Sequence, residues 1–505
     1  MHDSGPLTLI IPEHILKPIL VTAECIRLNK SILEPLSATA NCRKRKLVHA
    51  LEIHQALELL TETCKSPIGR HDLAGIKILP IIINLTRFLI SSSSRNLLYL
   101  SLKLLINLCN GEILNQDCFL EEDGIDVVAR VFDSVSFKTD IETTVYGLQL
   151  LGNLCPEGEE HRAAVWCRFF PVVFKDISRV RVREIADVLC MVLYACCDGS
   201  NALIGQLCGA QGLQILAEIL TTASTDKGED EFLVELLAKV CLGGSYFWPL
   251  LSELSIPAGA LEKTDSLSAA EKTFTPVNSY LLKTLYEYLF KKRHETVFLS
   301  KDFAVSILGL LKRVVRAVDF LSRDESHLPT YSPTVNVLGY TISIIMIICI
   351  RSEDAVVDLL LSSGLVNIFL GLLRELEQPE IIKKYNRQDL TGVEQKVCPY
   401  KGFRRDLVGV IGNCLHERKH VQDEIRHKNG ILLLLQQGVE DTENPGLRSF
   451  GNVAVNNLLY KNRENQQVVE KLRKGTAFVP ALVELRKGVV AVNSLTGRPT
   501  LVSHQ

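Results

Sequence analysis

A repeated motif limits the fold of this chain more than any other feature of its sequence. Asn107 and Asn413 start the two clearest copies, and each is followed by an apolar residue twelve positions on and by Gly124 or Gly430 seventeen positions on. A repeat at a fixed period indicates similar supersecondary units that stack on one another. The chain is therefore expected to form a stack of units rather than a single globular core.

Four further positions start weaker copies of the motif: Asn153, Ala195, Ile347 and Asn457. The spacing is 46 residues from Asn107 to Asn153, 42 on to Ala195, and 44 from Asn413 to Asn457. These values fall within the roughly 40 to 47 residues of armadillo and HEAT units. We therefore predict an all-α, armadillo/HEAT-like right-handed superhelical solenoid with a long concave face.

Each unit is expected to contain the same three steps. One helix ends near the asparagine, a short polar loop leads into a short amphipathic helix, and glycine then forms a sharp turn with a positive φ. No unit can bury its apolar face alone, so stacking closes the core.

The composition suits many similar helices packed against each other and gives no sign of a cofactor. Hydrophobic residues make up 47% of the 505, and Lys+Arg of 56 against Asp+Glu of 58 leaves a formal charge of -2. Such a balance provides no overall field to attract nucleic acid or a membrane surface. The 15 cysteines are scattered, without C-x-x-C spacing or a tight Cys/His cluster, so we expect reduced thiols, no metal and no cofactor.

The apolar run at 335–350 raises the question of a membrane span. Sixteen residues of helix cover roughly 24 Å, less than the ~30 Å hydrocarbon core of a bilayer. We therefore expect a helix buried within the stack and no membrane span.

The domain organisation follows the breaks in the repeat. We expect an N-terminal repeat array at 1–373, a loop or linker insertion at 374–401, and C-terminal repeats at 402–490. The insertion is either a binding or regulatory surface or a solvated spacer. The segment 491–505 has no helical period and is expected to be a disordered tail.

One string resembles a zinc-hydrolase motif. His416, Glu417 and His420 form H-E-x-x-H, which on a helix would direct two imidazoles to one zinc ion, with glutamate as general base. The string lies where other copies have their polar loop, and a third ligand is missing because Asp423 and Arg426 replace the glycine and the histidine of the longer metzincin motif. We interpret it as a solvated loop, keep zinc hydrolysis as an alternative, and expect no enzyme and no catalytic residue.

Two basic runs, 43–46 and 291–294, lack interleaved aromatic residues. We interpret them as solvated helix ends, with nuclear-import or phosphate-binding patches as the alternative.

The candidate binding residues are one asparagine per repeat: Asn107, Asn153, Asn413 and Asn457. Amides at the same helical position form a row along one side of a superhelix, and an amide both donates and accepts hydrogen bonds. The row therefore either clamps the backbone of an extended peptide or fixes each helix-to-loop junction.

The C-terminal repeats resemble the C-terminal domain of the ataxin-10 family over about 70 residues from Gly402. The matching positions are Phe403, Arg405, Asp406, Leu407, Ile411, Gly412, Asn413, Gln422, Asp423, Gly430, Ile431, Asp441, Asn444, Pro445, Asn457, Asn465 and Gln466. The sequence departs from the family at 448–451, where the family usually carries an acidic residue and a tryptophan.

The resemblance implies an armadillo-like, non-catalytic cytoplasmic or perinuclear adaptor with roles in neuronal survival, neurite growth and cytokinesis. We expect protein partners, no nucleic acid, and self-association into a homo-oligomer as one use of exposed solenoid ends. A nuclear transport adaptor is the alternative within the binding class. It would need an acidic or tryptophan-lined groove, and the chain has two tryptophans.

Overall fold

The computed structural model describes residues 17, 19–21, 50–91, 94–135, 137–156, 158–225, 228, 231–254, 274–322, 326–386, 395–473, 489–492 and 499–502. These residues belong to two compact units, 1–236 and 237–505. The boundary falls inside α14 (Glu231–Leu242), and so it differs from the division expected at 374–401.

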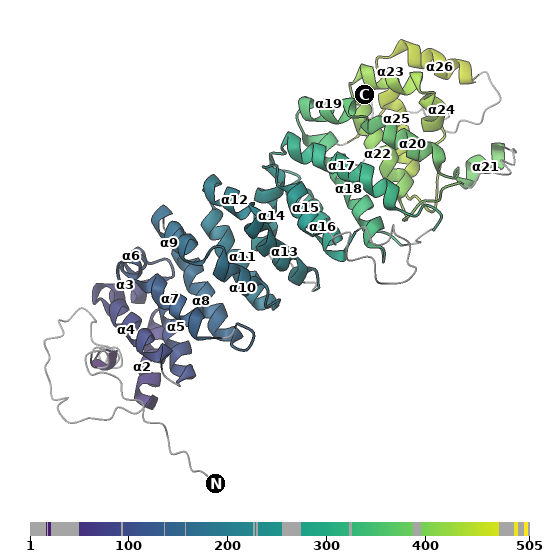
Figure 1. Cartoon of the computed structure of the whole chain (residues 1–505). Coiled ribbons are helices and arrows are strands. Elements are labelled where there is room, and N and C mark those ends of the chain that lie inside the picture. Colours follow the sequence, from purple (N-terminus) through teal and green to yellow (C-terminus); the bar gives the residue numbers. More distant parts are fainter. Residues whose placement is uncertain are drawn as a thin grey trace, which may run out of the picture. The chain divides into compact units, whose positions relative to one another are not determined.

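The first unit consists of helices in chain order (Figure 1). They are α2 (Ala50–Thr63), α3 (Pro67–Gly75), α4 (Ile78–Ile90), α5 (Arg95–Cys109), α6 (Ile113–Glu121), α7 (Gly124–Ser134), α8 (Ile141–Leu154), α9 (Glu159–Phe169), α10 (Val172–Ser178), α11 (Arg183–Cys197), α12 (Asn201–Leu207), α13 (Ala210–Ser224) and the start of α14. The long helix α8 packs between α5 and α11. The short helices that follow each long helix complete the repeats.

The second unit repeats this pattern and adds a small ribbon. Its elements are α15 (Phe247–Glu253), α16 (Pro276–Lys291), α17 (Lys301–Ala317), α18 (Pro333–Arg351), α19 (Asp354–Ser362), α20 (Leu365–Glu375), α21 (Glu380–Asn386), α22 (Phe403–Leu415), α23 (Lys419–His427), α24 (Gly430–Leu435), α25 (Leu447–Leu459), α26 (Arg463–Arg473), β1 (Val489–Val492) and β2 (Pro499–Val502). The long helices pack in series, α16 on α18, α18 on α22, and α22 on α25.

Helix α17 shows how the sequence specifies these elements. The side chain of Ser300 accepts a hydrogen bond from the backbone N–H of Phe303 and so caps the helix. Phe303, Ile307, Leu311 and Val314 recur at helical spacing and are buried. Each such side chain stabilises the fold by about 1.5–3 kcal/mol relative to an exposed position.

The repeat predicted from the sequence is the repeat of the structure. α5 ends two residues after Asn107, α6 follows as the short helix, and α7 begins at Gly124. α22, α23 and α24 have the same relation to Asn413 and Gly430. The prediction of an all-α solenoid is confirmed, and β1 and β2 are the only strands in the part of the chain that the structure describes.

The expected role of the glycines is wrong for two of these turns. The left-handed residue is Asp123 before Gly124 and Asn429 before Gly430, each with φ 53°. Glycine is needed here because a Cβ on Gly124 would lie 2.5 Å from the ring of Phe119. Glycine, which has no Cβ, allows that approach. Gly364, with φ 91° and nothing within 4 Å of its Cβ position, follows the original expectation.

Helix α18 contains the apolar run at 335–350. It is the one described helix that is long and apolar enough by itself to cross a membrane, and up to five spans would result if each bent helix pair were counted as one. In the structure 72% of its most apolar window is buried, and it packs against α16, α17 and α22. The expected helix buried within the stack is confirmed.

The structure describes parts of the segments expected as linker and tail, and their assignment as linker and tail stays a prediction. Between 374 and 401 the structure describes α21 and a bridge between Leu376 and Lys396, and Tyr400 is fully buried. A polar sequence can therefore still belong to the packed unit. β1 begins within the expected C-terminal repeats and extends into the expected tail, where it pairs antiparallel with β2, with Val489 opposite Val502, in agreement with the strand preference of valine.

The described cysteines are free thiols, and most are buried. Burial raises the pKa of Cys64 and of Cys208 to about 12, so these thiols stay protonated and unreactive near neutral pH. Cys167 is exposed.

Candidate functional site

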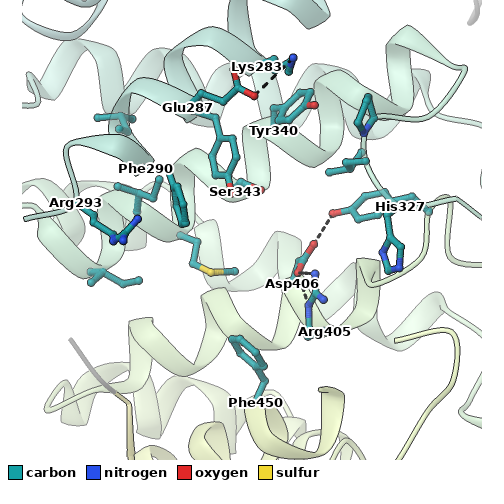
Figure 2. Close-up of a pocket in the computed structure, with 18 of the residues that line it drawn as sticks. Lys283, Glu287, Phe290, Arg293, His327, Tyr340, Ser343, Arg405, Asp406 and Phe450 are labelled. Carbon is teal, nitrogen blue, oxygen red and sulfur yellow. Dashed lines mark hydrogen bonds and ion pairs between the residues drawn. The ribbon is translucent and has the colours of Figure 1, made fainter. Parts of the chain in front are cut away.

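The second unit contains a pocket of about 790 Å³ on the face where its long helices stack (Figure 2). We call it the four-helix pocket because α16, α18, α22 and α25 all contribute to its lining, together with the loop at 327–329 and residues 400–401. Its volume is in the range of sites that bind small molecules or side chains of a partner. Ile347, which takes the asparagine position of its repeat, also lines it. The pocket therefore includes the asparagine-equivalent position of one repeat, whereas Asn413 and Asn457 do not line it.

Local sequence signals fix the four helices around the pocket. Thr275 and Asn278 form a capping box at the start of α16, and Ser332 caps α18. α22 and α25 each follow a left-handed glycine, Gly402 with φ 100° and Gly446 with φ 85°. The N–H of Gly402 donates to the carbonyl of Glu443 at 2.8 Å, so the starts of α22 and α25 are held together.

A buried polar cluster closes one side of the pocket. The hydroxyl of Tyr400 donates to Oδ2 of Asp406 at 2.9 Å, and the Nη2 and Nε of Arg405 donate to Oδ1 of Asp406 at 2.6 and 2.8 Å. Burial raises the pKa of Asp406, and Arg405 opposes that effect. Burial, together with the carboxylate, holds the pKa of Tyr400 well above its ordinary value. Because Asp406 is already paired, the cluster positions α22 and does not offer a free base.

Aromatic and apolar side chains line the middle of the pocket. The ring of Tyr286 lies 6.0 Å from that of Phe290 and 5.8 Å from that of Tyr340, measured between centroids. Phe290 remains 49% exposed, although it is an aromatic residue in a concave site. Burial raises the pKa of Tyr340 to about 12, so its hydroxyl stays neutral. Phe450 lies at the opposite wall in Figure 2, within the stretch where the sequence departs from the family resemblance.

The charged residues of the lining are unevenly paired. Glu287 lies 3.6 Å from Lys283, and Asp406 is paired with Arg405. These are the two carboxylates of the lining, against five Lys and Arg side chains. Arg293, part of the basic run at 291–294, lies over the ring of Phe290 at 5.1 Å. That run was expected to be a solvated helix end, and the structure instead places one of its members in the pocket wall.

The structure does not form the arrangement that zinc hydrolysis would need. His416 follows the last residue of α22, Glu417 has a positive φ of 56°, and His420 lies in α23. The two histidines therefore belong to different elements and remain exposed. Among the described residues no group of three or more His, Cys, Asp or Glu side chains could hold a metal ion. The second basic run, 43–46, lies outside the described residues.

The asparagine row lies at equivalent positions in α5, α8, α22 and α25, and all four side chains are half-buried. The amide of Asn153 donates to the carbonyl of Ile106 at 3.0 Å, and that of Asn457 donates to the carbonyl of Gly412 at 2.9 Å. Each acceptor is the residue before the asparagine of the preceding copy. These two contacts favour the junction role for Asn153 and Asn457, and the peptide-clamp role stays a prediction.

Further amides complete these contacts, and they were not predicted as site residues from the sequence. Nine residues after Asn107 and Asn413 stand Gln116 and Gln422, both buried. Gln116 Nε2 donates to the carbonyls of Cys109 and Asn153 at 2.8 and 2.9 Å. We call Asn115, Gln116 and Asn153 together the first amide junction. A glutamine at a fixed distance after the asparagine is the signal that could have revealed it.

The second amide junction is the equivalent set in the second unit, formed by Gln422, Asn457, Asn462 and Asn465. Gln422 Nε2 donates to the carbonyl of Asn457 at 2.8 Å and lies 3.4 Å from that of Leu415. Asn462 donates to the Oε1 of Gln422 at 3.1 Å, and Asn465 donates to the carbonyl of Leu458 at 2.9 Å. Repeats in this unit are thus joined through side-chain amides that bind main-chain carbonyls.

Comparison with known proteins identifies relatives that align with about three-quarters of the chain and others that align with its C-terminal region. Residues 403–499 match the family described as the spinocerebellar ataxia type 10 protein domain. Ataxin-10 of Bos taurus is 23% identical over 404 residues, covering 76% of this chain and 77% of that protein. The human protein gives the same identity and coverage over 401 residues. An ataxin-10 homolog of Dictyostelium discoideum is 37% identical over 86 residues, or 17% of this chain and 14% of that protein.

Solved structures give weaker likenesses. A crystal structure of an engineered protein aligns with 87% of this chain and 98% of its own, at 14% identity and a TM-score of 0.37. A structure from a study of a phosphorylation switch in the interaction between cadherin and beta-catenin aligns with 81% of this chain and 73% of its own, at 11% identity and a TM-score of 0.32. The C-terminal domain match and the ataxin-10 alignments over three-quarters of the chain agree with the motifs of 402–490, and they support the resemblance of this protein to the ataxin-10 family.

Proposed function

We propose that this protein is a non-catalytic scaffold of the cytoplasm, including its perinuclear part, and that it binds partner proteins through the four-helix pocket. The ataxin-10 family is not a known enzyme family, which agrees with a binding role. Roles in neuronal survival, neurite growth and cytokinesis enter the proposal through the family resemblance. Self-association into a homo-oligomer stays a prediction, which light scattering after size exclusion tests directly.

One observation supports the choice of the pocket as the binding site. The pocket combines a half-exposed aromatic ring, that of Phe290, with a number of cationic side chains that exceeds the number of carboxylates in the lining. Aromatic and arginine side chains that remain accessible in a concave site are the residues enriched at the energetic centres of protein interfaces. Asp406 is paired with Arg405 and is not a free base in the same place.

Filling the pocket tests this proposal whatever the partner is. Ser343 lines the pocket, and its hydroxyl donates to the carbonyl of Gly339 within α18. A Ser343→Trp substitution should occupy the space that a partner would use. Ser362→Trp is the matched control, because Ser362 is exposed on α19 and likewise donates to a carbonyl of its own helix.

Partner capture from cytosolic extract, quantified by mass spectrometry, compares the two variants after both show the helical circular dichroism of the intact protein. We expect Ser343→Trp to lose a set of proteins that the intact chain and Ser362→Trp retain. An identical set for all three would show that partners bind elsewhere, and the proposed site would then be wrong.

The asparagine row provides a second candidate surface. Asn107 and Asn413 make no side-chain hydrogen bond among the described contacts, so their amides are available to a partner. An Asn107→Ala, Asn413→Ala double variant in the same capture experiment tests it. Loss of partners here with retention in Ser343→Trp would transfer the proposal from the pocket to the row.

A further inference from the structure

The four-helix pocket carries more positive charge than the carboxylates of its lining neutralise. Among the described residues, neither Arg293 nor Lys401 has a carboxylate within 4.0 Å, whereas both carboxylates of the lining are paired. Arg351 donates to the carbonyls of Leu289 and Lys292 at 2.9 and 2.7 Å, with no carboxylate partner described. The chain as a whole has a formal charge of -2. The pocket is therefore a local positive site on a nearly neutral protein.

These cations are distributed around the rings rather than gathered at one point. Figure 2 places Arg293 beside Phe290 at one side of the pocket and Arg405 at the other, with Phe450 below. A single small anion would need donors that converge on it. Charges at separate places along an apolar centre instead match a chain that carries several carboxylates around an apolar side chain.

The dimensions favour an extended chain. Four helices packed at about 10 Å spacing span roughly 30 Å, the length of about nine extended residues. The pocket, with a volume of about 790 Å³, accommodates a large side chain, and Tyr286, Met346 and Phe450 are among the residues that line it. Aromatic side chains gain most from such a site, because ring contacts add to the area that they bury.

We propose that the four-helix pocket binds an extended acidic segment of a partner protein and holds one aromatic side chain of that segment between its rings. This rests on the proposed scaffold function and specifies the chemistry of the partner. Carboxylates of the segment pair with Arg293 and Lys401, and the aromatic side chain contacts Phe290 and Phe450.

A defined peptide tests this chemistry without knowledge of the natural partner. The probe is fluorescein-labelled Gly-Glu-Asp-Glu-Phe-Glu-Asp-Glu-Gly, and its binding to the full chain is followed by fluorescence anisotropy. Two altered peptides accompany it, one with alanine in place of phenylalanine and one with lysine in place of every acid. We expect the probe to bind, the alanine peptide to bind about fivefold more weakly or worse, and the lysine peptide not to bind.

Charge reversal in the pocket is the decisive part of the peptide-binding experiment. Arg293→Glu with Lys401→Glu should weaken binding of the probe by about tenfold or more, because two attractive contacts become repulsive. The matched control, Lys301→Glu with Arg316→Glu, makes the same change of net charge at exposed positions of α17 outside the pocket. It should retain the affinity within about twofold.

A loss common to both double variants would show that only the overall charge matters and would overturn the proposal. Equal affinity for the phenylalanine and alanine peptides would overturn the aromatic part, and equally strong competition by oligothymidylate would show a site for polyanions of any kind. If the charge-reversed chain loses its helical circular dichroism, Arg293→Gln with Lys401→Gln replaces it, with the same expected order of affinities.

The variant Phe450→Ala separates the two halves of the proposal. It should weaken binding of the phenylalanine peptide and leave the alanine peptide unchanged. Failure of every peptide to bind, while Ser343→Trp still loses cytosolic partners, would overturn the chemistry proposed here and leave the scaffold function standing.

Discussion

Both amide junctions join neighbouring repeats by hydrogen bonds, but the network of the second junction is more complete than that of the first. In the first unit Gln116 is buried and both donors of its amide are used, but its Oε1 has no hydrogen-bond partner. In the second unit the Oε1 of Gln422 accepts from Asn462, and the surrounding Asp423, Arg426 and Asn465 extend the network. A complete network rigidifies a core, whereas an unpaired buried acceptor costs free energy. The difference indicates that the second unit is held more firmly between its repeats.

The largest expected effect comes from removing the glutamine of each junction. Gln422→Leu should lower the free energy of unfolding by about 2–3 kcal/mol, because it leaves buried carbonyls without their side-chain donor and removes one of the two acceptors of the Asn462 amide. Gln116→Leu should cost about 1–2 kcal/mol, since one of its own buried atoms is unpaired to begin with. Urea unfolding followed by circular dichroism measures both.

Gln466 provides the control for that comparison. It stands nine residues after Asn457 and donates to the carbonyl of Leu459 at 2.8 Å, but it is exposed. Gln466→Leu should change stability by no more than about 0.5 kcal/mol. A cost for Gln116→Leu equal to or above that of Gln422→Leu would contradict the comparison.

The asparagines should have a smaller effect that separates into two classes. Asn153→Ala and Asn457→Ala each remove a hydrogen bond to the preceding repeat and should cost about 1 kcal/mol. Asn107→Ala and Asn413→Ala remove no described side-chain hydrogen bond and should stay within about 0.5 kcal/mol. Thermal unfolding of the four single variants measures this. Equal losses at all four positions would show that the row is not divided in this way.

The smallest effect concerns pH and affects the second junction. The hydrogen bond from Asn462, with the Arg426 guanidinium, lowers the pKa of Asp423 below its ordinary value of 3.8. A depressed pKa contributes stability above the unfolded value, and that contribution is lost as the pH falls through the folded value. The difference in Tm between the intact protein and Asp423→Asn should therefore shrink as the pH is lowered below 3.8. A difference that stays constant from pH 7 to pH 2.5 would rule out this linkage.

The sequence predicted the elements of the fold because the period of the repeat constrains every unit at once. It placed the helix ends near Asn107 and Asn413 and the buried helix of 335–350 correctly. At Gly124 the sequence predicted a positive φ, but the reason for glycine there is the close approach of the Phe119 ring. That contact forms only in the folded structure and leaves no recognisable pattern in the sequence. The small strands at 489–492 and 499–502 were missed because short segments without repeats carry little signal.

The candidate site was harder to predict for a physical reason. The pocket assembles side chains from Lys283 to Phe450, on four helices that are far apart in sequence, and each helix contributes only the residues of one face. Arg293 was recognised as part of a basic run, but its position over Phe290 depends on the packed end of α16. The asparagine row was recognised, and its contacts with carbonyls of the preceding repeat required the stacked structure.

The amide junctions bind main-chain carbonyls, and every residue type supplies the same carbonyl. The acceptors of Asn153 and Asn457 are Ile106 and Gly412, two residues with nothing in common but their backbone. Substitution of an acceptor residue therefore leaves the bond between neighbouring copies intact. The helices of a solenoid joined in this way can therefore diverge widely in sequence while neighbouring repeats keep the same stacking geometry. Low sequence identity between two repeats says little about whether they can pack against each other.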